Sequence, residues 1–379
     1  MNGDKLSEQA FAQIIADHGG RLYRVGGCVR DAFLGKTPKD IDFCITGMVK
    51  KQFKQLFPAA EEQGKSFPVF RLLVDGVWCE AAFARTERKE GSGYKGFVVR
   101  SNPKVTIEED LFRRDTTVNS IAVDCLTGLV VDPFQGRADI AGKLLRATSV
   151  HFAEDPVRAL RLAGQAARLD FTVEPATLAL AGQVAGELAQ EPPERLLAEL
   201  TKVLTDAAEP DRFFQVLAAA DLLRVAFGEL AALPSDNFAD SMTNLRAVAR
   251  VTAKPKLRFA VFGLELAEED LNRWNQRMTL PGEWLKAALT LGKVATLLSE
   301  PAPGPERIVQ ALQLLGRGVL PVEEFDLISR TVAAPYPRLD PFKAALATLP
   351  RETAPPGLSG REQGQWIKQR QIEAIAKLL

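Results

Sequence analysis

The sequence predicts an α+β protein, in which a head of mixed strands and short helices precedes an elongated all-helical part. Residues 1–145 are rich in glycine and alternate β-branched runs with turn residues. After about Thr148, alanine, leucine, glutamate and arginine dominate, with apolar residues at helical spacing. We therefore expect a head at 1–145, a helical neck at 146–223, and a helical body and tail at 224–379.

The head is expected to contain a mixed or antiparallel sheet, because its strand-like runs are short and tight turns join several of them. Asp75-Gly76 and Thr127-Gly128 each separate two such runs, which is typical of hairpins. The expected elements are, in chain order, a strand at 21–26, a turn at Gly26-Gly27, a helix from Val29 to Leu34, a strand at 40–45, a hairpin of 67–74 with 77–83, a charged glycine-rich loop at 86–95, and a hairpin within 121–131.

The helical part follows from the spacing of its apolar residues. Helices are predicted at 157–169, 194–204 and 211–223, punctuated by Pro192-Pro193 and Pro210. The remainder also has a helical pattern, with proline-rich breaks at 333–341 and near 355–356.

Composition narrows the class of protein. With 48 basic and 48 acidic residues the formal net charge is zero, which gives no support to nucleic-acid binding but does not exclude a local basic face. The cysteines are scattered without a CxxC pair, which argues against a disulfide framework or a zinc site. No signal-peptide pattern and no apolar run of about 20 residues occurs, so we expect a cytoplasmic protein without a membrane span. The two histidines are too few for a histidine-based metal site, and His151 is expected to be structural.

An acidic pair beside a glycine turn is the strongest chemical signal. In a strand, residues two apart point the same way, so Asp40 and Asp42 are expected to project from one face. Two such carboxylates repel each other unless a cation lies between them, and oxygen ligands beside phosphates favour Mg²⁺. The Gly26-Gly27 turn directs backbone N–H groups toward an anion, which Arg30 would also reach.

This pattern predicts metal-assisted phosphoryl chemistry. A lone Asp-x-Asp is usually a solvated loop, and the glycine turn with Arg30 is what favours the functional interpretation. Such a site needs a third carboxylate, for which Glu80, on a strand at 79–84, is the candidate.

Two segments, GGCVRDAFLG at 26–35 and KDIDF at 39–43, resemble the signature of the bacterial class II tRNA nucleotidyltransferase and poly(A) polymerase family. This family belongs to the polymerase β-like nucleotidyltransferase superfamily. Further matching segments follow in the family's order: RRDTTVNSIA at 113–122, DPFQG at 132–136, EDPVRALR at 154–161 and PERLLAEL at 193–200. The match is strong to about Leu223 and weak beyond it.

The resemblance implies a role for each matching residue. Asp40 and Asp42 correspond to metal-binding aspartates and Glu80 to the third acidic residue. Contacts to substrate are implied for Gly26, Gly27 and Arg30 (triphosphate), Arg114, Asp115 and Asn119 (ribose and phosphate), Asp155 and Arg158 (the incoming base), Glu154 (support of that pair), and Arg85 and Arg161. The implied cofactor is Mg²⁺, and the implied partners are tRNA, CTP and ATP.

The pair Asp155 and Arg158 is chemically suited to choosing C and A. Residues three apart on a helix share a face, so both side chains can meet one base edge. Aspartate only accepts hydrogen bonds and arginine only donates them. Cytosine and adenine each present an amino group beside a ring-nitrogen acceptor, whereas uracil and guanine present the reverse pattern. A purely structural alternative is that Glu154 and Asp155 begin a helix and favour its dipole.

Two segments favour full CCA addition. Residues 64–70 and 84–94 resemble CCA-adding enzymes of the gammaproteobacterial kind, and Gly91–Gly93 matches the loop that is needed to switch from C to A. A poly(A) polymerase, a CC- or A-adding enzyme, and a non-catalytic RNA-binding relic remain alternatives. Relatives usually have Arg-Phe where this chain has Gly164-Gln165, which leaves fine nucleotide selection open.

The C-terminal part is expected to bind tRNA. No histidine follows His151, so we expect no HD phosphohydrolase site. The candidate phosphate contacts, each with a solvated helix charge as its alternative, are Lys254, Lys256, Arg258, Arg361, Lys368 and Arg370. The tryptophans Trp274, Trp284 and Trp366 are expected to pack rather than stack on bases. The sequence leaves the oligomeric state open.

Overall fold

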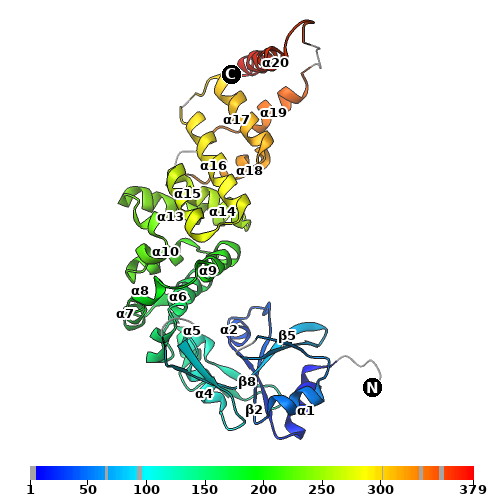
Figure 1. Cartoon of the computed structure of the whole chain (residues 1–379), viewed down its shortest axis with the longest axis vertical. Helices are drawn as coiled ribbons and strands as arrows, with labels where there is room; N and C mark the ends of the chain where they lie inside the picture. The colour runs from blue at the N-terminus through cyan, green and yellow to red at the C-terminus, as the bar shows by residue number, and fades with distance from the viewer. Residues whose placement is uncertain (1–5, 65–66, 92–95, 301, 333–335, 350–353) are drawn as a thin grey trace. The chain divides into compact units, whose positions relative to one another are not determined.

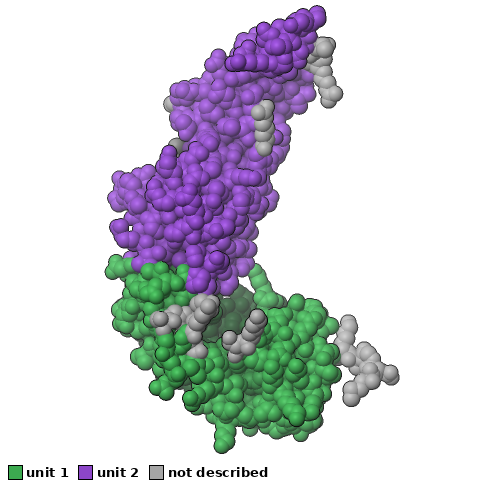
Figure 2. Space-filling model, viewed as in Figure 1, with its two compact units in different colours: residues 1–191, 219–222 green, residues 192–218, 223–379 purple. Residues whose placement is uncertain are grey.

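The computed structural model describes residues 6–64, 67–91, 96–300, 302–332, 336–349 and 354–379. They form two compact units, residues 1–191 with 219–222 and residues 192–218 with 223–379 (Figure 2). The first unit contains a mixed sheet and the second is helical, so the predicted α+β class is confirmed. The finer domain bounds at 145 and 223 stay predictions.

A mixed sheet organises the first unit. Within the described residues it has seven strands in the order β3-β4-β5-β2-β1-β8-β9 (Figure 1). Its strands are β1 (Arg21–Val25), β2 (Asp42–Thr46), β3 (Glu61–Gln63), β4 (Val69–Val74), β5 (Val77–Phe83), β8 (Ala122–Asp124) and β9 (Val130–Val131). The β2–β5 pair is parallel, and the other neighbours are antiparallel.

The β4–β5 hairpin forms as predicted. Asp75 and Gly76 join the strands with φ angles of 50° and 80°. Positive φ at both central residues suits the right-handed twist of the two strands, which is why the Asp-Gly pair favours this turn. The register that follows places Leu73 opposite Trp78 and Arg71 opposite Glu80.

One face of the sheet is covered and the other is partly open. Helices α1 (Glu8–Asp17) and α3 (Lys50–Leu56) contribute to an aromatic core on the covered face, whose rings are those of Phe11, Phe43, Phe53, Phe70 and Phe83. On the opposite face α4 (Ile107–Phe112) packs against Tyr23, Val25 and Cys44. Strand residues alternate between faces, so exposed Asp42 and Glu80 lie on this second face.

The loop predicted at 86–95 is in part a strand, so that prediction was wrong. Strand β6 (Thr86–Lys89) pairs antiparallel with β7 (Phe97–Arg100). Its charged side chains form ion pairs, which is why their polarity did not prevent a strand. The loop predicted at Gly91–Gly93 to switch from C to A lies outside the described residues except for Gly91, and Lys65 and Ser66 also lie outside them.

Helices complete the first unit. They are α2 (Gly27–Phe33), α5 (Gly136–Ala141), α6 (Val157–Leu169), α7 (Pro175–Gly182) and α8 (Ala185–Leu188). The prediction for 157–169 is confirmed at both ends. Helix α6 is alanine-rich and most of its residues are buried, which brings Arg158 and Gln165 into the interior.

The second unit is helical in all its described elements. These are α9 (Pro193–Asp206), α10 (Asp211–Ala219), α11 (Leu223–Ala226), α12 (Gly228–Ala231), α13 (Ser235–Ala249), α14 (Pro255–Phe262), α15 (Glu268–Met278), α16 (Gly282–Leu297), α17 (Pro305–Arg317), α18 (Val322–Ile328), α19 (Asp340–Ala347) and α20 (Gly360–Ala376). Trp274 and Trp284 are buried, as expected, and Trp274 packs edge-on to Phe259. No helix among the described residues combines the length and apolar character that crossing a membrane requires.

Arg258, a candidate phosphate contact, does not lie on the surface of the protein. Its side chain is buried and donates hydrogen bonds to the backbone carbonyls of Leu204, Ala207, Ala249 and Thr252. These carbonyls lie at or just beyond the C-terminal ends of α9 and α13, where helices leave carbonyl groups without intrahelical partners. Both interpretations of Arg258, a phosphate contact and a solvated helix charge, are therefore wrong.

Candidate active site

Two recesses of the first unit meet at Asp42. The arginine recess has a volume of about 280 Å³ and is lined by Gly26, Gly27, Asp42, Arg85, Glu87, Arg113, Arg114, Asp115, Asn119, Asp155, Arg158 and Arg161. The acidic recess has a volume of about 430 Å³ and is lined by Asp40, Ile41, Asp42, Gln63, Arg71, Trp78, Cys79 and Glu80. Among the described residues, Asp42 alone lines both.

Asp110 fixes two arginines of the arginine recess. Thr106 and Glu109 form a capping box that begins α4, and Asp110 follows in its first turn. Arg113 and Arg114 come three and four residues later, so both reach back to the Asp110 carboxylate, at 2.7 and 2.9 Å. Burial alone would raise the pKa of Asp110, but the two arginine charges outweigh it and hold that pKa below its usual range.

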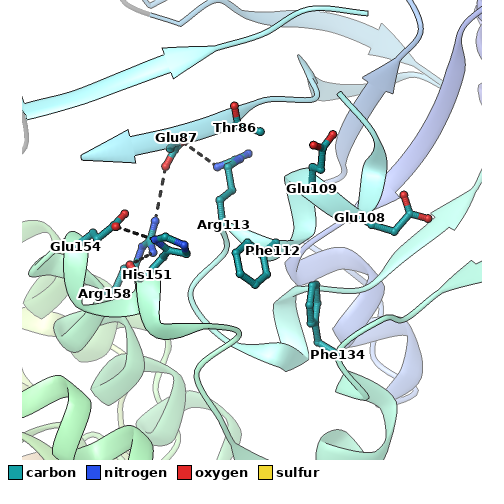
Figure 3. A pocket seen from close by; sticks show the side chains of 10 residues that line it. All are labelled: Thr86, Glu87, Glu108, Glu109, Phe112, Arg113, Phe134, His151, Glu154 and Arg158. Carbon is teal, nitrogen blue, oxygen red and sulfur yellow. Dashed lines mark hydrogen bonds and ion pairs between the residues drawn. The ribbon is translucent and has the colours of Figure 1, made fainter. Parts of the chain in front are cut away.

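Glu87 joins Arg113 to two further guanidinium groups. Its Oε1 accepts hydrogen bonds from Arg85 at 2.8 Å and Arg113 at 3.0 Å, and its Oε2 lies 3.6 Å from Arg158. Figure 3 shows Glu87 on its strand with Arg113 on one side and Arg158 on the other. Burial opposes ionisation of Glu87, but these arginines lower its pKa. The carboxylate therefore stays charged and keeps the arginines in place.

Asp115 is held by donors on every side. Its Oδ1 accepts from the backbone N–H of Thr116 at 2.8 Å and from Asn119 at 3.0 Å, and its Oδ2 accepts from Arg161 at 2.8 Å and Gln165 at 3.1 Å. Burial would raise its pKa, yet the charge of Arg161 and these hydrogen bonds hold the pKa of Asp115 far below its usual range. The departure at Gln165 therefore completes this network, since Gln165 also accepts from Thr116 Oγ1 at 2.6 Å.

The acidic recess has the opposite electrostatics. Parallel pairing of β2 with β5 sets Asp42 beside Glu80, and both are exposed. Desolvation by the surrounding protein, and then the charge of Glu80, raise the pKa of Asp42 above its usual range; Asp40 adds to the shift, and Arg114 opposes it. Carboxylates that repel each other in this way favour a cation.

Asp40 is not in the strand, so its predicted alternation with Asp42 was wrong. The chain bends at residues 39–40 and β2 begins only at Asp42. Asp40 nevertheless lines the acidic recess with Asp42 and Glu80. Within the part of the chain that is described, no three His, Cys, Asp or Glu side chains are grouped closely enough to hold a metal ion by themselves. The donor set fits Mg²⁺, which binds through one or two carboxylates together with substrate phosphates.

Gly26 brings the backbone close to the same place. Its φ is 75°, a conformation that favours glycine, and a Cβ there would lie 3.1 Å from Arg114 Nη1 and 4.0 Å from Asp42 Oδ2. Arg30, in contrast, is not among the described residues that line either recess. Its guanidinium donates to Asp31 and, at 2.7 Å, to Asn119 Oδ1. Arg30 thus orients Asn119, which in turn holds Asp115.

Asp155 and Arg158 share the arginine recess but not one helix. Asp155 has extended backbone angles, and α6 begins two residues later at Val157, so the expected helical spacing was wrong. The Asp155 Oδ1 instead accepts from the Val157 backbone N–H at 3.1 Å, which supports the start of α6. Arg158 is buried and donates to the His151 carbonyl at 2.7 Å.

Glu154 faces a neighbouring cavity of about 370 Å³, shown in Figure 3, which shares Glu87, Arg113 and Arg158 with the arginine recess. There its carboxylate is 2.7 Å from His151 Nδ1, and the His151 ring lies edge-on to Phe112. Its backbone carbonyl accepts from Lys89 of β6 at 2.7 Å. Glu154 thus lies behind the arginine recess and links the β6 strand to the segment that carries Asp155.

Sequence reasoning missed four residues of the site: Glu87, Asp110, Arg113 and Gln165. A signal was present for Asp110, because arginines three and four residues after an aspartate on a capped helix are expected to pair with it. Glu87 joins residues distant in the chain, so its role could be seen only in the fold. Gln165 was noticed as a departure, but its partners were not identifiable.

Comparison with known proteins gives a consistent result. Residues 22–146 match the poly A polymerase head domain, and residues 170–233 match a probable RNA- and SrmB-binding site of polymerase A. A CCA-adding enzyme of Pseudomonas putida W619 is 36% identical over 94% of this chain and 97% of its own length. One from Coxiella burnetii RSA 331 is 38% identical over 72% of this chain and 70% of its own.

Solved structures share the fold. An apo form of a CCA-adding enzyme superposes with a TM-score of 0.72 at 22% identity, covering 97% of this chain and 90% of that one. The Thermotoga maritima CCA-adding enzyme, complexed with tRNA, superposes with a TM-score of 0.71 at 21% identity, covering 98% and 95%. With sequence similarity along nearly its whole length, the chain belongs to the family of CCA-adding enzymes built on the poly A polymerase head domain.

Proposed function

We propose that this protein adds C, C and A in turn to the 3′ end of tRNA, using CTP and ATP without a nucleic-acid template. In each step the 3′-hydroxyl oxygen attacks the α-phosphorus, a phosphodiester forms, and pyrophosphate leaves. The observation that carries the proposal is that an arginine-lined recess and an acidic recess meet at Asp42 in a chain related over 94% of its length to a CCA-adding enzyme.

The arginine recess is suited to a nucleoside triphosphate. Arg85, Arg113, Arg114, Arg158 and Arg161 line it, and Glu87, Asp110 and Asp115 orient them. Guanidinium groups held in advance bind phosphate oxygens without a further cost of ordering. The backbone at Gly26 and Gly27 lets the triphosphate approach Asp42 closely, while Asn119 and Asp115 offer polar groups to the ribose.

Asp40 and Asp42 would hold Mg²⁺, with Glu80 beside them. The metal would supply charge stabilisation for the triphosphate and lower the pKa of the attacking hydroxyl. Burial, and then repulsion by Glu80 and Asp40, raise the pKa of Asp42, so a bound cation would favour the ionised form of this carboxylate. The chain itself contributes the ionised carboxylates and directs the triphosphate toward them.

Choice of the base falls to Asp155 and Arg158, which line the same recess. The carboxylate accepts from the amino group of cytosine or adenine, and the guanidinium donates to the adjacent ring nitrogen. A well-placed pair of this kind discriminates by about 1–3 kcal/mol. Glu87 and the His151 carbonyl hold Arg158, so the pair is rigid enough to reject uracil and guanine.

We further propose that the helical second unit binds the body of the tRNA and that the protein acts in the cytoplasm. Lys254 and Lys256 pair with Glu324, so they carry less free charge for phosphate than the sequence suggested.

An incorporation assay tests the proposal. The protein is incubated with Mg²⁺ and a tRNA that ends before CCA, with CTP alone, ATP alone, or both. Addition that stops after C, C and A supports the proposal. Long A tails would indicate a poly(A) polymerase, arrest after C and C a partial enzyme, and tRNA binding without incorporation a non-catalytic relic. Each of these three outcomes would overturn full CCA addition.

A further inference from the structure

One wall of the acidic recess is aromatic and basic instead of acidic. Trp78 and Arg71 form it, and the Arg71 guanidinium carbon lies 4.6 Å from the centre of the Trp78 ring. Trp78 is 46% exposed, although large aromatic side chains are usually well buried. A guanidinium stacked on one side of an exposed indole leaves an apolar surface oriented and open to a ligand.

The hairpin places this pair in line with the carboxylates. Trp78 and Glu80 are two residues apart on β5, so they point from the same face at a spacing of about 7 Å. Arg71 on β4 lies opposite Glu80 on β5, and Asp42 on β2 lies opposite Glu80 on the other side of β5. The Trp78 ring, Arg71, Glu80 and Asp42 therefore lie together on the open face of the sheet and line one recess.

We propose that Trp78, braced by Arg71, is the stacking platform for the 3′-terminal base of the RNA that is extended. This inference rests on the proposed function. A nucleotidyl transfer needs two substrates to meet at one place, and the arginine recess accounts for the triphosphate. The acidic recess opens on the other side of Asp42, so the attacking 3′-hydroxyl enters from there.

The chemistry of a tryptophan platform fits this position. The terminal base of the acceptor is not the same in all three additions, because the first extends the base that precedes CCA and the later two each extend a C. A contact that recognised one base by hydrogen bonds would therefore fail at one of the steps. Stacking on an aromatic ring accepts every base, because every base has a π face. Arg71 adds a positive charge where the terminal phosphate would otherwise meet only carboxylates. The arginine recess thus selects the incoming base beside Arg158, whereas the acidic recess positions any terminal base of the acceptor beside Trp78.

Steady-state kinetics of Trp78→Ala test the platform. With CTP saturating, the KM for a tRNA ending before CCA is expected to rise about tenfold, since stacking on one base contributes that order of affinity. With tRNA saturating, the KM for CTP should stay within about twofold, because the arginine recess is unchanged. A short RNA acceptor should show a larger rise than whole tRNA, since it lacks contacts to the rest of the protein. Trp78→Phe, which keeps a ring, should recover most of the loss.

Phe33→Ala is the matched control. Phe33 is an exposed aromatic of the same unit whose ring lies 5.2 Å from the Arg137 guanidinium, and it lines neither recess. Its removal should leave the KM for tRNA unchanged. If the wild type incorporates nucleotides but Trp78→Ala has an unaltered KM for tRNA, or a raised KM for CTP instead, the platform is refuted and the proposed function stands. If the wild type incorporates nothing, the proposed function fails first. A thermal melt of each variant separates misfolding from lost stacking.

Discussion

The arginine recess and the acidic recess adjoin at one side chain but treat charge in opposite ways. In the first, Glu87 and Asp115, together with Asp110 behind them, pair with arginines, and the pKa values of all three carboxyl groups are lowered. In the second, carboxylates face one another and the pKa of Asp42 is raised. The charges of the arginine recess are thus balanced by side chains of the protein itself, whereas the carboxylates of the acidic recess repel one another and favour a cation.

The largest effect is expected from Asp42→Asn. Removing this charge should lower kcat for CTP incorporation by at least about a thousandfold, because several kcal/mol of metal-assisted stabilisation are lost. Without Mg²⁺ the variant should be no less stable than the wild type, since a repelling charge is gone. Asp240→Asn, an exposed aspartate of the second unit, is the control and should retain activity. Marked destabilisation of Asp42→Asn in the absence of metal would break the comparison.

Asp115→Asn should act in the opposite direction on stability. The substitution weakens the bonds to Arg161 and Gln165 in a buried network and should lower the free energy of unfolding by about 3 kcal/mol. Urea unfolding measures this change. Asp139→Asn is a matched control, since Asp139 is also buried and paired with an arginine, Arg146, but lies outside both recesses. Asp139→Asn should reduce stability without raising the KM for CTP, whereas Asp115→Asn should reduce stability and also raise the KM for CTP.

Glu87→Gln sharpens the account of the arginine recess. With a neutral side chain, Arg113 and Arg158 lose an ionic partner, so preference for CTP and ATP over UTP and GTP should fall by about tenfold. Competition assays with mixed nucleotides measure the ratio of kcat/KM values. Glu108→Gln, in the neighbouring cavity of Figure 3 but outside the Glu87 network, should leave that ratio unchanged. Undiminished selectivity in Glu87→Gln would show that Arg158 is held without Glu87.

The smallest effect is a difference in pH dependence. Because the folded-state pKa of Asp42 is raised, its charge costs stability above that pKa, and the cost disappears as the pH falls through it. The thermal midpoint of Asp42→Asn without Mg²⁺ should therefore exceed that of the wild type by about 1 °C at neutral pH, the exposed position reducing the effect. The gap should close on acidification.

Asp115 should show the reverse sign in the same experiment. Its folded-state pKa is depressed, so the stability that it contributes is present above the pKa of an ordinary aspartate and is lost only as the pH falls toward the folded-state value. The gap between wild type and Asp115→Asn should persist at a pH where the Asp42 gap has closed. Gaps that close together would refute the electrostatic contrast between the two recesses.

Much of the fold was predictable because its signals are local. The Asp75-Gly76 turn indicated the hairpin, and apolar spacing gave the limits of α6. Strand β6 was missed because its residues are charged, and only its ion partners on distant segments make a strand there favourable. Local pattern cannot supply such partners.

The site was predictable in composition more than in geometry. Motif resemblance named most residues that line the arginine recess. The pairing of Asp40 with Asp42 was expected from a strand, and that of Asp155 with Arg158 from a helix, but the strand begins only at Asp42 and the helix only at Val157. Those pairs meet through irregular backbone, which follows no period that a sequence reveals. The network of Glu87 and Asp110 depends on contacts between strands and helices far apart in sequence.

The two-residue turn at Asp75 and Gly76 has a consequence for how this protein can change over time. Side chains of β5 alternate strictly between the filled and open faces, so one extra residue in the turn would send Trp78 and Glu80 into the phenylalanine core and bring Cys79 and Ala81 outward. Most surface connections tolerate insertions. In this turn a change of length would remove both Trp78 and Glu80 from the acidic recess in a single event.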